Sequence, residues 1–247
     1  MDISFLDTAV LTSFAVLTSV ISALAGMAGG VLLLSLLSFY LPYSALIPIH
    51  GMTQLVSNSS RAWYLRDHIE WKIFVPFALG VPLGAGAVTL WVVGSMSERI
   101  PYFLISVLIF YTVFRPKKMP PLRLSSTGFF FLGAFAGGLG ILMGATGPLL
   151  APFFLGKELT KKNLIATQAA AQFSVHLVKI PSFLYLGFSF LDYGVLILLL
   201  GVGAIAGTRL GVQLLHRVSE KVFMIAFKTL LVLAALRLLY KAIGGLL

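Results

Sequence analysis

Long apolar stretches follow one another along almost the whole chain, separated by short polar connections. Eight such segments can be recognised, at residues 8–41, 43–65, 71–94, 100–114, 127–155, 162–187, 191–215 and 222–246. Since about 20 apolar residues allow a helix to cross a bilayer, the pattern predicts an all-α polytopic membrane protein. The first and fifth segments are too long for one ordinary span, and glycines interrupt both of them.

Composition agrees with a chain embedded in lipid. It is 59% hydrophobic and 11% charged, whereas soluble domains carry about 25% charged residues. The absence of cysteine excludes disulfides, thiolate metal sites and a cysteine nucleophile. The acidic N-terminus MDISFLD is unlike a signal peptide, so the first segment is expected to stay in the protein. The net charge of +10 falls in short loops, which favours cytoplasmic loop charge over nucleic-acid binding.

The chain repeats itself at an offset of 118 residues. The residues GMAGG at 26–30 then fall on GATGP at 144–148, and Gln54 falls on Gln172. Internal duplication of membrane segments is typical of transporters rather than of membrane enzymes. We therefore expect two membrane repeats and a basic linker, at residues 1–116, 124–247 and 117–123.

The distribution of Lys and Arg favours an inverted arrangement of the two repeats. If all eight segments cross the membrane once, nine loop cations lie on one side and six on the other. If the first and fifth segments turn back at their glycines, twelve lie on one side and three on the other. Cytoplasmic loops concentrate Lys and Arg, so the second topology is preferred, with both termini outside a cell membrane. In this count Arg61 is a loop charge, whereas Lys179, Arg209 and Lys228 lie inside apolar segments.

The second segment of each repeat carries a polar stripe at spacing i, i+4, i+8, i+11. The stripes are His50, Gln54, Asn58 and Arg61, and Gln168, Gln172, His176 and Lys179. At this spacing the four side chains fall within about 80° of one helix face. Polar groups in a bilayer are costly, so they should face the protein interior or a water-filled cavity. Hydrogen bonding between helices is the alternative, but the recurrence beside a glycine break favours a binding site.

The placement of acidic residues indicates the sign of the ligand. All eight lie at a terminus or in a predicted loop: Asp2, Asp7, Asp67, Glu70, Glu98, Glu158, Asp192 and Glu220. A cation carrier or a carboxylate-based proton relay would normally need a buried acid, whereas an anion carrier would not. Arg209 and Lys228 lie near segment ends, where their long side chains can reach the membrane surface.

The glycine breaks supply the other part of an anion site. A helix that restarts in the membrane exposes unpaired N–H groups and the positive end of its dipole, and glycine lets a ligand approach them closely. Gly29 and Gly30 occupy this place in the first repeat, and Thr146 and Gly147 in the second. Pro148 suits the first turn of a new helix. Glycines at regular spacing are instead interpreted as helix-packing ladders: Gly80, Gly84, Gly203, Gly207 and Gly211.

At these residues the chain resembles the TauE/SafE (sulfite exporter) family of permeases. The resemblance rests on the two glycine-rich segments, on the acidic–aromatic pairs Glu70-Trp71 and Asp192-Tyr193, and on the glycine-spaced segments that follow each pair. It covers nearly the whole chain. It implies a permease for sulfite, for sulfonates such as sulfoacetate, or for related small anions.

The sequence thus predicts a secondary carrier that moves a small sulfur-containing oxyanion by alternating access, without a cofactor or metal. The residues expected to bind it are Gly29, Gly30, His50, Gln54, Asn58, Thr146, Gly147, Gln168, Gln172, His176 and Lys179. The expected partners are the anion and the bilayer, with a homodimer as a candidate assembly and no nucleic acid.

Two other functions stay open at this stage. One is a passive anion channel, which the same residues could form. The other is an intramembrane enzyme, which is disfavoured because Ser174 and His176 point to different helix faces. Neither His50 nor His176 has an acidic partner within its segment to complete a nucleophilic site.

Overall fold

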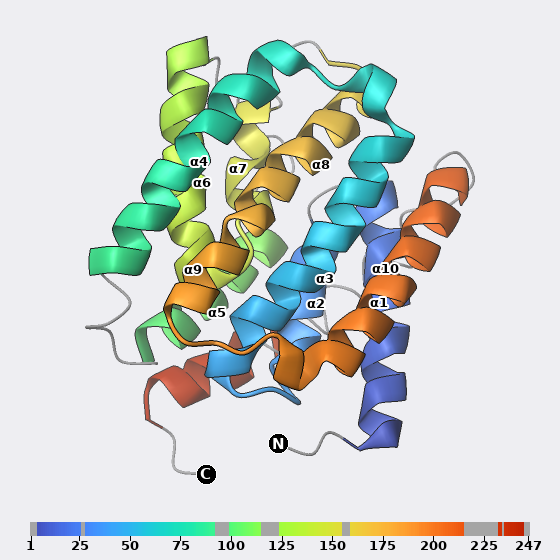
Figure 1. Cartoon of the computed structure of the whole chain (residues 1–247), viewed down its shortest axis with the longest axis vertical. Coiled ribbons are helices and arrows are strands. Elements are labelled where there is room, and N and C mark those ends of the chain that lie inside the picture. Colours follow the sequence, from blue (N-terminus) through green and yellow to red (C-terminus); the bar gives the residue numbers. More distant parts are fainter. Residues whose placement is uncertain are drawn as a thin grey trace.

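The computed structural model is a bundle of helices over the residues it describes, which are 4–25, 28–91, 99–114, 124–154, 159–214, 232–233 and 235–244 (Figure 1). Its principal helices are α1 Phe5–Ala25, α2 Ala28–Leu37, α3 Tyr43–Tyr64, α4 Trp71–Trp91, α5 Arg99–Phe114, α6 Ser126–Met143, α7 Gly147–Phe154, α8 Lys161–Leu177, α9 Lys179–Tyr185 and α10 Gly194–Leu214. Short 3₁₀ turns, η1 Arg66–His68 and η3 Leu191–Tyr193, precede α4 and α10. The predicted all-α class is confirmed. About half of the predicted segment at 222–246 lies outside the described residues.

Within the described part of the chain, four helices are long and apolar enough to cross a membrane: Phe5–Leu24, Trp71–Trp91, Ser126–Met143 and Leu191–Leu214. Their outer faces carry large exposed aliphatic side chains, such as Leu79, Leu83 and Leu198. In a helix every backbone hydrogen bond is made within the segment, so such faces can contact hydrocarbon. The helix α6 begins where Ser125 Oγ accepts a hydrogen bond from the N–H of Gly128, a common start signal.

Both long segments are divided into two helices, as predicted. The helix α6 ends at Met143, and Gly144 follows with φ of 79°, a left-handed conformation that glycine adopts easily. The chain restarts as a helix at Gly147. In the first half α1 ends at Ala25 and α2 starts at Ala28, with the two intervening residues outside the described part.

The sixth segment is also divided, which was not predicted. The helix α8 ends at Leu177 and α9 begins at Lys179. Pro181 explains the interruption, because it has no N–H to donate to the carbonyl of Leu177 and its ring crowds that carbonyl.

Two pairs of helices pack with their backbones almost touching, and each pair joins the two halves of the chain. The helix α4 lies along α6, and α1 lies along α10. A Cβ atom on Gly84 would lie 1.7 Å from the carbonyl oxygen of Ala134, and one on Gly207 would lie 2.1 Å from that of Val16. The interpretation of these glycines as packing ladders is confirmed.

The helices α3 and α8 pack against each other in the middle of the molecule and run in opposite directions (Figure 1). Beyond the end of α3, Asn163 Nδ2 donates to Glu70 Oε1 over 2.9 Å, and the N–H of Glu70 donates to Thr167 Oγ1 over 3.0 Å. At the opposite end, His50 lies beside His176. Two inverted copies of one helix would pack in this way, although the repeat boundaries and the orientation in the membrane stay predictions.

Candidate functional site

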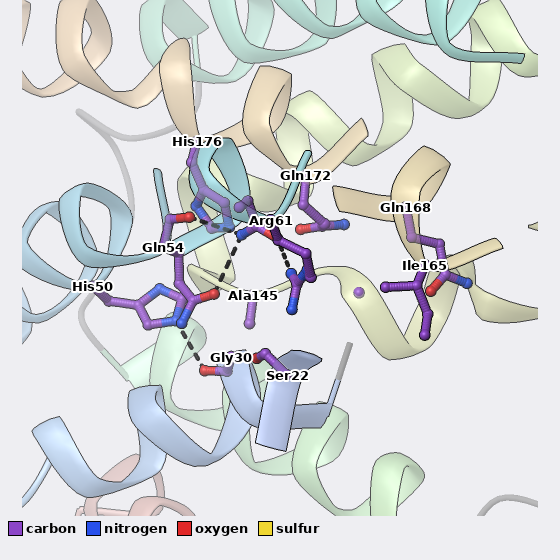
Figure 2. A pocket seen from close by; sticks show the side chains of 12 residues that line it. Ser22, Gly30, His50, Gln54, Arg61, Ala145, Ile165, Gln168, Gln172 and His176 are labelled. Atoms are coloured by element: carbon purple, nitrogen blue, oxygen red, sulfur yellow. Dashed lines mark hydrogen bonds between the residues drawn. The ribbon is translucent and has the colours of Figure 1, made fainter. Parts of the chain in front are cut away.

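The glycine breaks and both polar stripes meet around one buried cavity (Figure 2). Its lining residues are Ser22, Gly30, His50, Gln54, Asn58, Arg61, Ala145, Gly147, Ile165, Gln168, Gln172 and His176. They come from α1, α2 and α3 of the first half, and from α7, α8 and the α6–α7 connection of the second. Residues predicted from two distant parts of the sequence are therefore brought to one place.

The cavity is small. Its volume is about 20 Å³. On this measure a cavity needs about 10–15 Å³ to hold a single water molecule. The polar side chains around it are withdrawn from solvent, since Gln54 and Asn58 are each 2% exposed. A ligand in this conformation would therefore be compact and would lie among buried polar side chains.

Arg61 supplies a buried positive charge in the last turn of α3, where it is only 3% exposed. Its Nη2 atom donates to Asn58 Oδ1, and Asn58 Nδ2 in turn donates to Gln54 Oε1 over 3.3 Å. These bonds run along one helix face and hold the guanidinium group toward the cavity (Figure 2). The assignment of Arg61 to a loop was wrong, because a hydropathy pattern does not show that the end of α3 is covered by α8.

Several buried donors at the cavity have no acceptor among the described residues. They are Nε and Nη1 of Arg61 and Nε2 of Gln54. A buried donor without a hydrogen bond costs about 1–3 kcal/mol, and more when it is charged. Three such groups on two neighbouring side chains therefore form a cradle suited to a ligand that accepts hydrogen bonds.

Two histidines from opposite halves of the chain lie at the cavity. The Nε2 atom of His50 is 2.9 Å from the carbonyl oxygen of Gly30, which can only accept, so Nε2 carries the hydrogen. The rings of His50 and His176 meet edge to face, with their centroids 5.7 Å apart. The Nδ1 atoms of both rings are buried and make no hydrogen bond within the described chain.

The N-terminal ends of two short helices lie beside the same cavity. Gly147 opens α7 and Gly30 lies in the first turn of α2, and both line the cavity. In the first turn of α7, Pro148 has no N–H, and Leu149 donates to the carbonyl of Thr146 over 3.1 Å. The positive ends of both helix dipoles therefore add to the charge of Arg61.

Three predicted site residues do not line the cavity. A Cβ on Gly29 would lie 2.1 Å from the carbonyl oxygen of Thr18, so this glycine lets α2 pack against α1, the alternative role for such glycines. Thr146 lies between the lining residues Ala145 and Gly147, and its Oγ1 accepts a hydrogen bond from Nε2 of the lining residue Gln172 over 3.4 Å.

Lys179 is the third. Its side chain is buried, and its Nζ atom donates to the carbonyl oxygen of Gly144. Carbonyls at the end of a helix lack partners within it, and a cation is favourable there. Gly51 makes room for this side chain, since a Cβ there would lie 2.9 Å from Lys179 Cδ. Lys179 therefore braces the break after α6, while Arg61, its counterpart in the other stripe, faces the cavity.

The predicted set of site residues omitted four residues that line the cavity: Ser22, Arg61, Ala145 and Ile165. Arg61 could have been found, because it belongs to the polar stripe, and Ala145 belongs to the second glycine break. Ser22 and Ile165 give no such signal. None of the lining residues is acidic, and the described acidic residues Asp7, Asp67, Glu70 and Asp192 lie elsewhere.

Broken apolar helices around a buried polar cavity place the molecule among membrane permeases. The family model described as Sulfite exporter TauE/SafE matches residues 11–238, nearly the whole chain. The chain belongs to the TauE/SafE sulfite exporter family and is a transmembrane transporter of the sulfite exporter type, which confirms the resemblance found in the sequence. No curated protein and no solved structure matches it.

Proposed function

We propose that the protein is a secondary carrier for a small sulfur-containing oxyanion, with sulfite as the leading candidate, in a multi-pass arrangement in the cell membrane. The observation that carries this proposal is the buried guanidinium group of Arg61. Two of its nitrogens have no hydrogen-bond partner among the described residues, and none of the described residues that line the cavity with it is acidic. A buried charge is costly unless it is paired, and an anion in the cavity would pair it.

The donors suit an oxyanion in number as well as in charge. The Nε and Nη1 atoms of Arg61 point to different sides of the guanidinium group, and each can donate to an anion oxygen in a short, strong, charge-assisted hydrogen bond. Gln54 Nε2 can hold another oxygen, and the N-terminal end of α7 at Gly147 lies beside the same space. Gln168, Gln172 and Asn58 would complete the site.

The size of the cavity supports a compact ion. A cavity of about 20 Å³ is better suited to sulfite than to an organosulfonate, since sulfoacetate carries an additional carboxymethyl group. We therefore expect sulfoacetate to be transported more slowly, because the site must expand to admit it.

Transport would proceed by alternating access without a chemical energy source of its own, as no nucleotide-binding loop occurs in the sequence. Paired half-helices near the middle of the membrane are a known arrangement for ligand sites in secondary transporters. Here α2 and α7 contact each other beside the cavity, and their movement apart would change access to it.

The proposal is tested by flux into liposomes that contain the purified full-length chain. Radiolabelled sulfite should enter saturably, and unlabelled sulfite inside the liposomes should accelerate its entry, which a passive channel would not show. A Gln172→Ala, His176→Ala double variant should be slower. Entry no faster than into protein-free liposomes would overturn the proposal, and equal rates for the wild type and the double variant would overturn the site assignment.

A further inference from the structure

We propose that His50 and His176 form a proton-binding site, so that the carrier takes up a proton with each anion it binds. This inference rests on the proposed function, because the cavity anion is part of the coupling. It adds the coupling ion, which the family assignment leaves undefined.

The geometry gives both imidazoles a nitrogen able to receive a proton. Nε2 of His50 is occupied by its bond to Gly30, which leaves the lone pair of Nδ1. Nδ1 of His50 and Nδ1 of His176 are buried without a hydrogen-bond partner in the described chain. Figure 2 shows the two rings at one end of the cavity, Ile165 and Gln168 at the other, and Arg61 between them.

The charged and polar groups that act on the pair come from α2, α3 and α9. His50 faces Lys179 from α9 and the carbonyl of Gly30 from α2. His176 faces Lys179, His50 and, from α3, Arg61. On the side of the α6 break there is only backbone at Gly144, where a Cβ would lie 3.6 Å from Nδ1 of His50. No described carboxylate lines the cavity.

A proton on either ring would therefore lie near Lys179, and a proton on His176 would lie near Arg61 as well, with no described carboxylate at the cavity to balance it. An oxyanion in the cavity would supply that balance, because it would place negative charge between the histidines and Arg61. Binding free energies are reciprocal, so an anion that favours the proton is itself favoured by the proton to the same degree. Anion and proton should consequently bind together and move in the same direction.

Intramembrane ionisable residues commonly mark proton pathways, and histidine is the side chain best suited to exchange protons near neutral pH. A third histidine provides a matched control. His68 lies in the 3₁₀ turn η1, between α3 and α4, and does not line the cavity.

The decisive measurement is the ratio of protons to anions moved. Liposomes that contain the full-length chain and a trapped pH indicator would take up radiolabelled sulfite. The initial rate of sulfite entry and the initial rate of proton entry would be measured in the same preparation. Sulfite brings some protons of its own, equally in every variant. We expect the ratio to fall in His50→Gln and His176→Gln, and to stay at the wild-type value in His68→Gln.

A ratio equal in all four proteins while sulfite still enters would overturn the inference and leave the proposed function standing. A wild type that moves no sulfite would overturn the proposed function, and the inference with it. These two failures are distinguished by the sulfite signal alone.

A second measurement needs no folded His50 or His176 variant. Wild-type protein labelled with ¹⁵N in histidine only would be examined by NMR in detergent at neutral pH, before and after saturation with sulfite. The variants His68→Gln and His216→Gln identify the signals of the other two histidines of the chain. We expect the remaining imidazole signals, those of His50 and His176, to move toward the positions of the doubly protonated ring. The inference is wrong if both keep the neutral pattern in saturating sulfite.

Discussion

The Nζ atom of Lys179, at the start of α9, donates a hydrogen bond to the carbonyl oxygen of Gly144, at the end of α6. This bond joins the bend after α8 to the glycine break that precedes α7. It predicts that Lys179→Met will lower the thermal stability of the purified protein, because an unsatisfied buried carbonyl costs about 1–3 kcal/mol. Lys162→Met, at an exposed position of α8, is the control. Equal melting temperatures of the two variants would contradict the bracing role.

The close approach of α4 and α6 predicts opposite effects for two glycines on the same helix. A Cβ on Gly84 would lie 1.7 Å from the carbonyl oxygen of Ala134, whereas nothing lies within 4 Å of one on Gly86. Gly84→Ala should destabilise the protein by about 1–3 kcal/mol, the usual effect of overpacking. Gly86→Ala should be neutral or stabilising, since alanine is the better helix former. Thermal unfolding in detergent measures both, and a Gly84→Ala protein as stable as Gly86→Ala would refute the backbone contact.

Arg61 is expected to dominate anion affinity. Hydrogen bonds to a charged group contribute about 1.5–3 kcal/mol, so Arg61→Gln should raise the half-saturating sulfite concentration by roughly 10- to 100-fold. Arg66→Gln is the matched control, because Arg66 is exposed and lies over the ring of Trp63. Concentration-dependent flux in liposomes provides the measurement. If both variants shift the half-saturating concentration equally, the cavity is not the binding site.

The predicted topology can be tested with single cysteines, since the chain contains none. Ser4, Ser126 and Ser189 are exposed, and each can be replaced by Cys. A maleimide that does not cross membranes should label Ser4→Cys and Ser189→Cys in intact cells, and Ser126→Cys only after the cells are opened. Labelling of Ser126→Cys in intact cells would show that the basic linker is outside.

Local sequence was sufficient to predict the broken helices and the meeting of the two polar stripes. The second break depends on a left-handed residue at Gly144 and a helix start at Gly147, both of which are properties of a few consecutive residues. The stripes depend on helical periodicity, which places Gln54 and Asn58 on one face. Such features do not require knowledge of neighbouring helices.

The roles of the two cations could not be predicted in this way. Arg61 and Lys179 occupy the same position in their stripes, yet one lines the cavity and the other binds a backbone carbonyl. The difference arises from packing, because Pro181 ends the helical hydrogen bonding near Leu177 and Gly51 opens space for the lysine chain. The role of Gly29 could not be predicted either, because it depends on how closely α1 passes. Only the structure shows that the lack of a side chain at Gly29 lets α2 pack against α1.

The two glycine-lined pairs determine which parts of the molecule can move. Since α4 is joined to α6 and α1 to α10, each pair contains one helix from either half of the chain. Displacing one half against the other as a rigid body would separate both pairs at their tightest contacts. We therefore expect the moving bodies of the proposed carrier to be composites, each made of helices from both halves of the chain. Hinges would then lie within each half, where the chain leaves one composite for the other, and not in the basic linker.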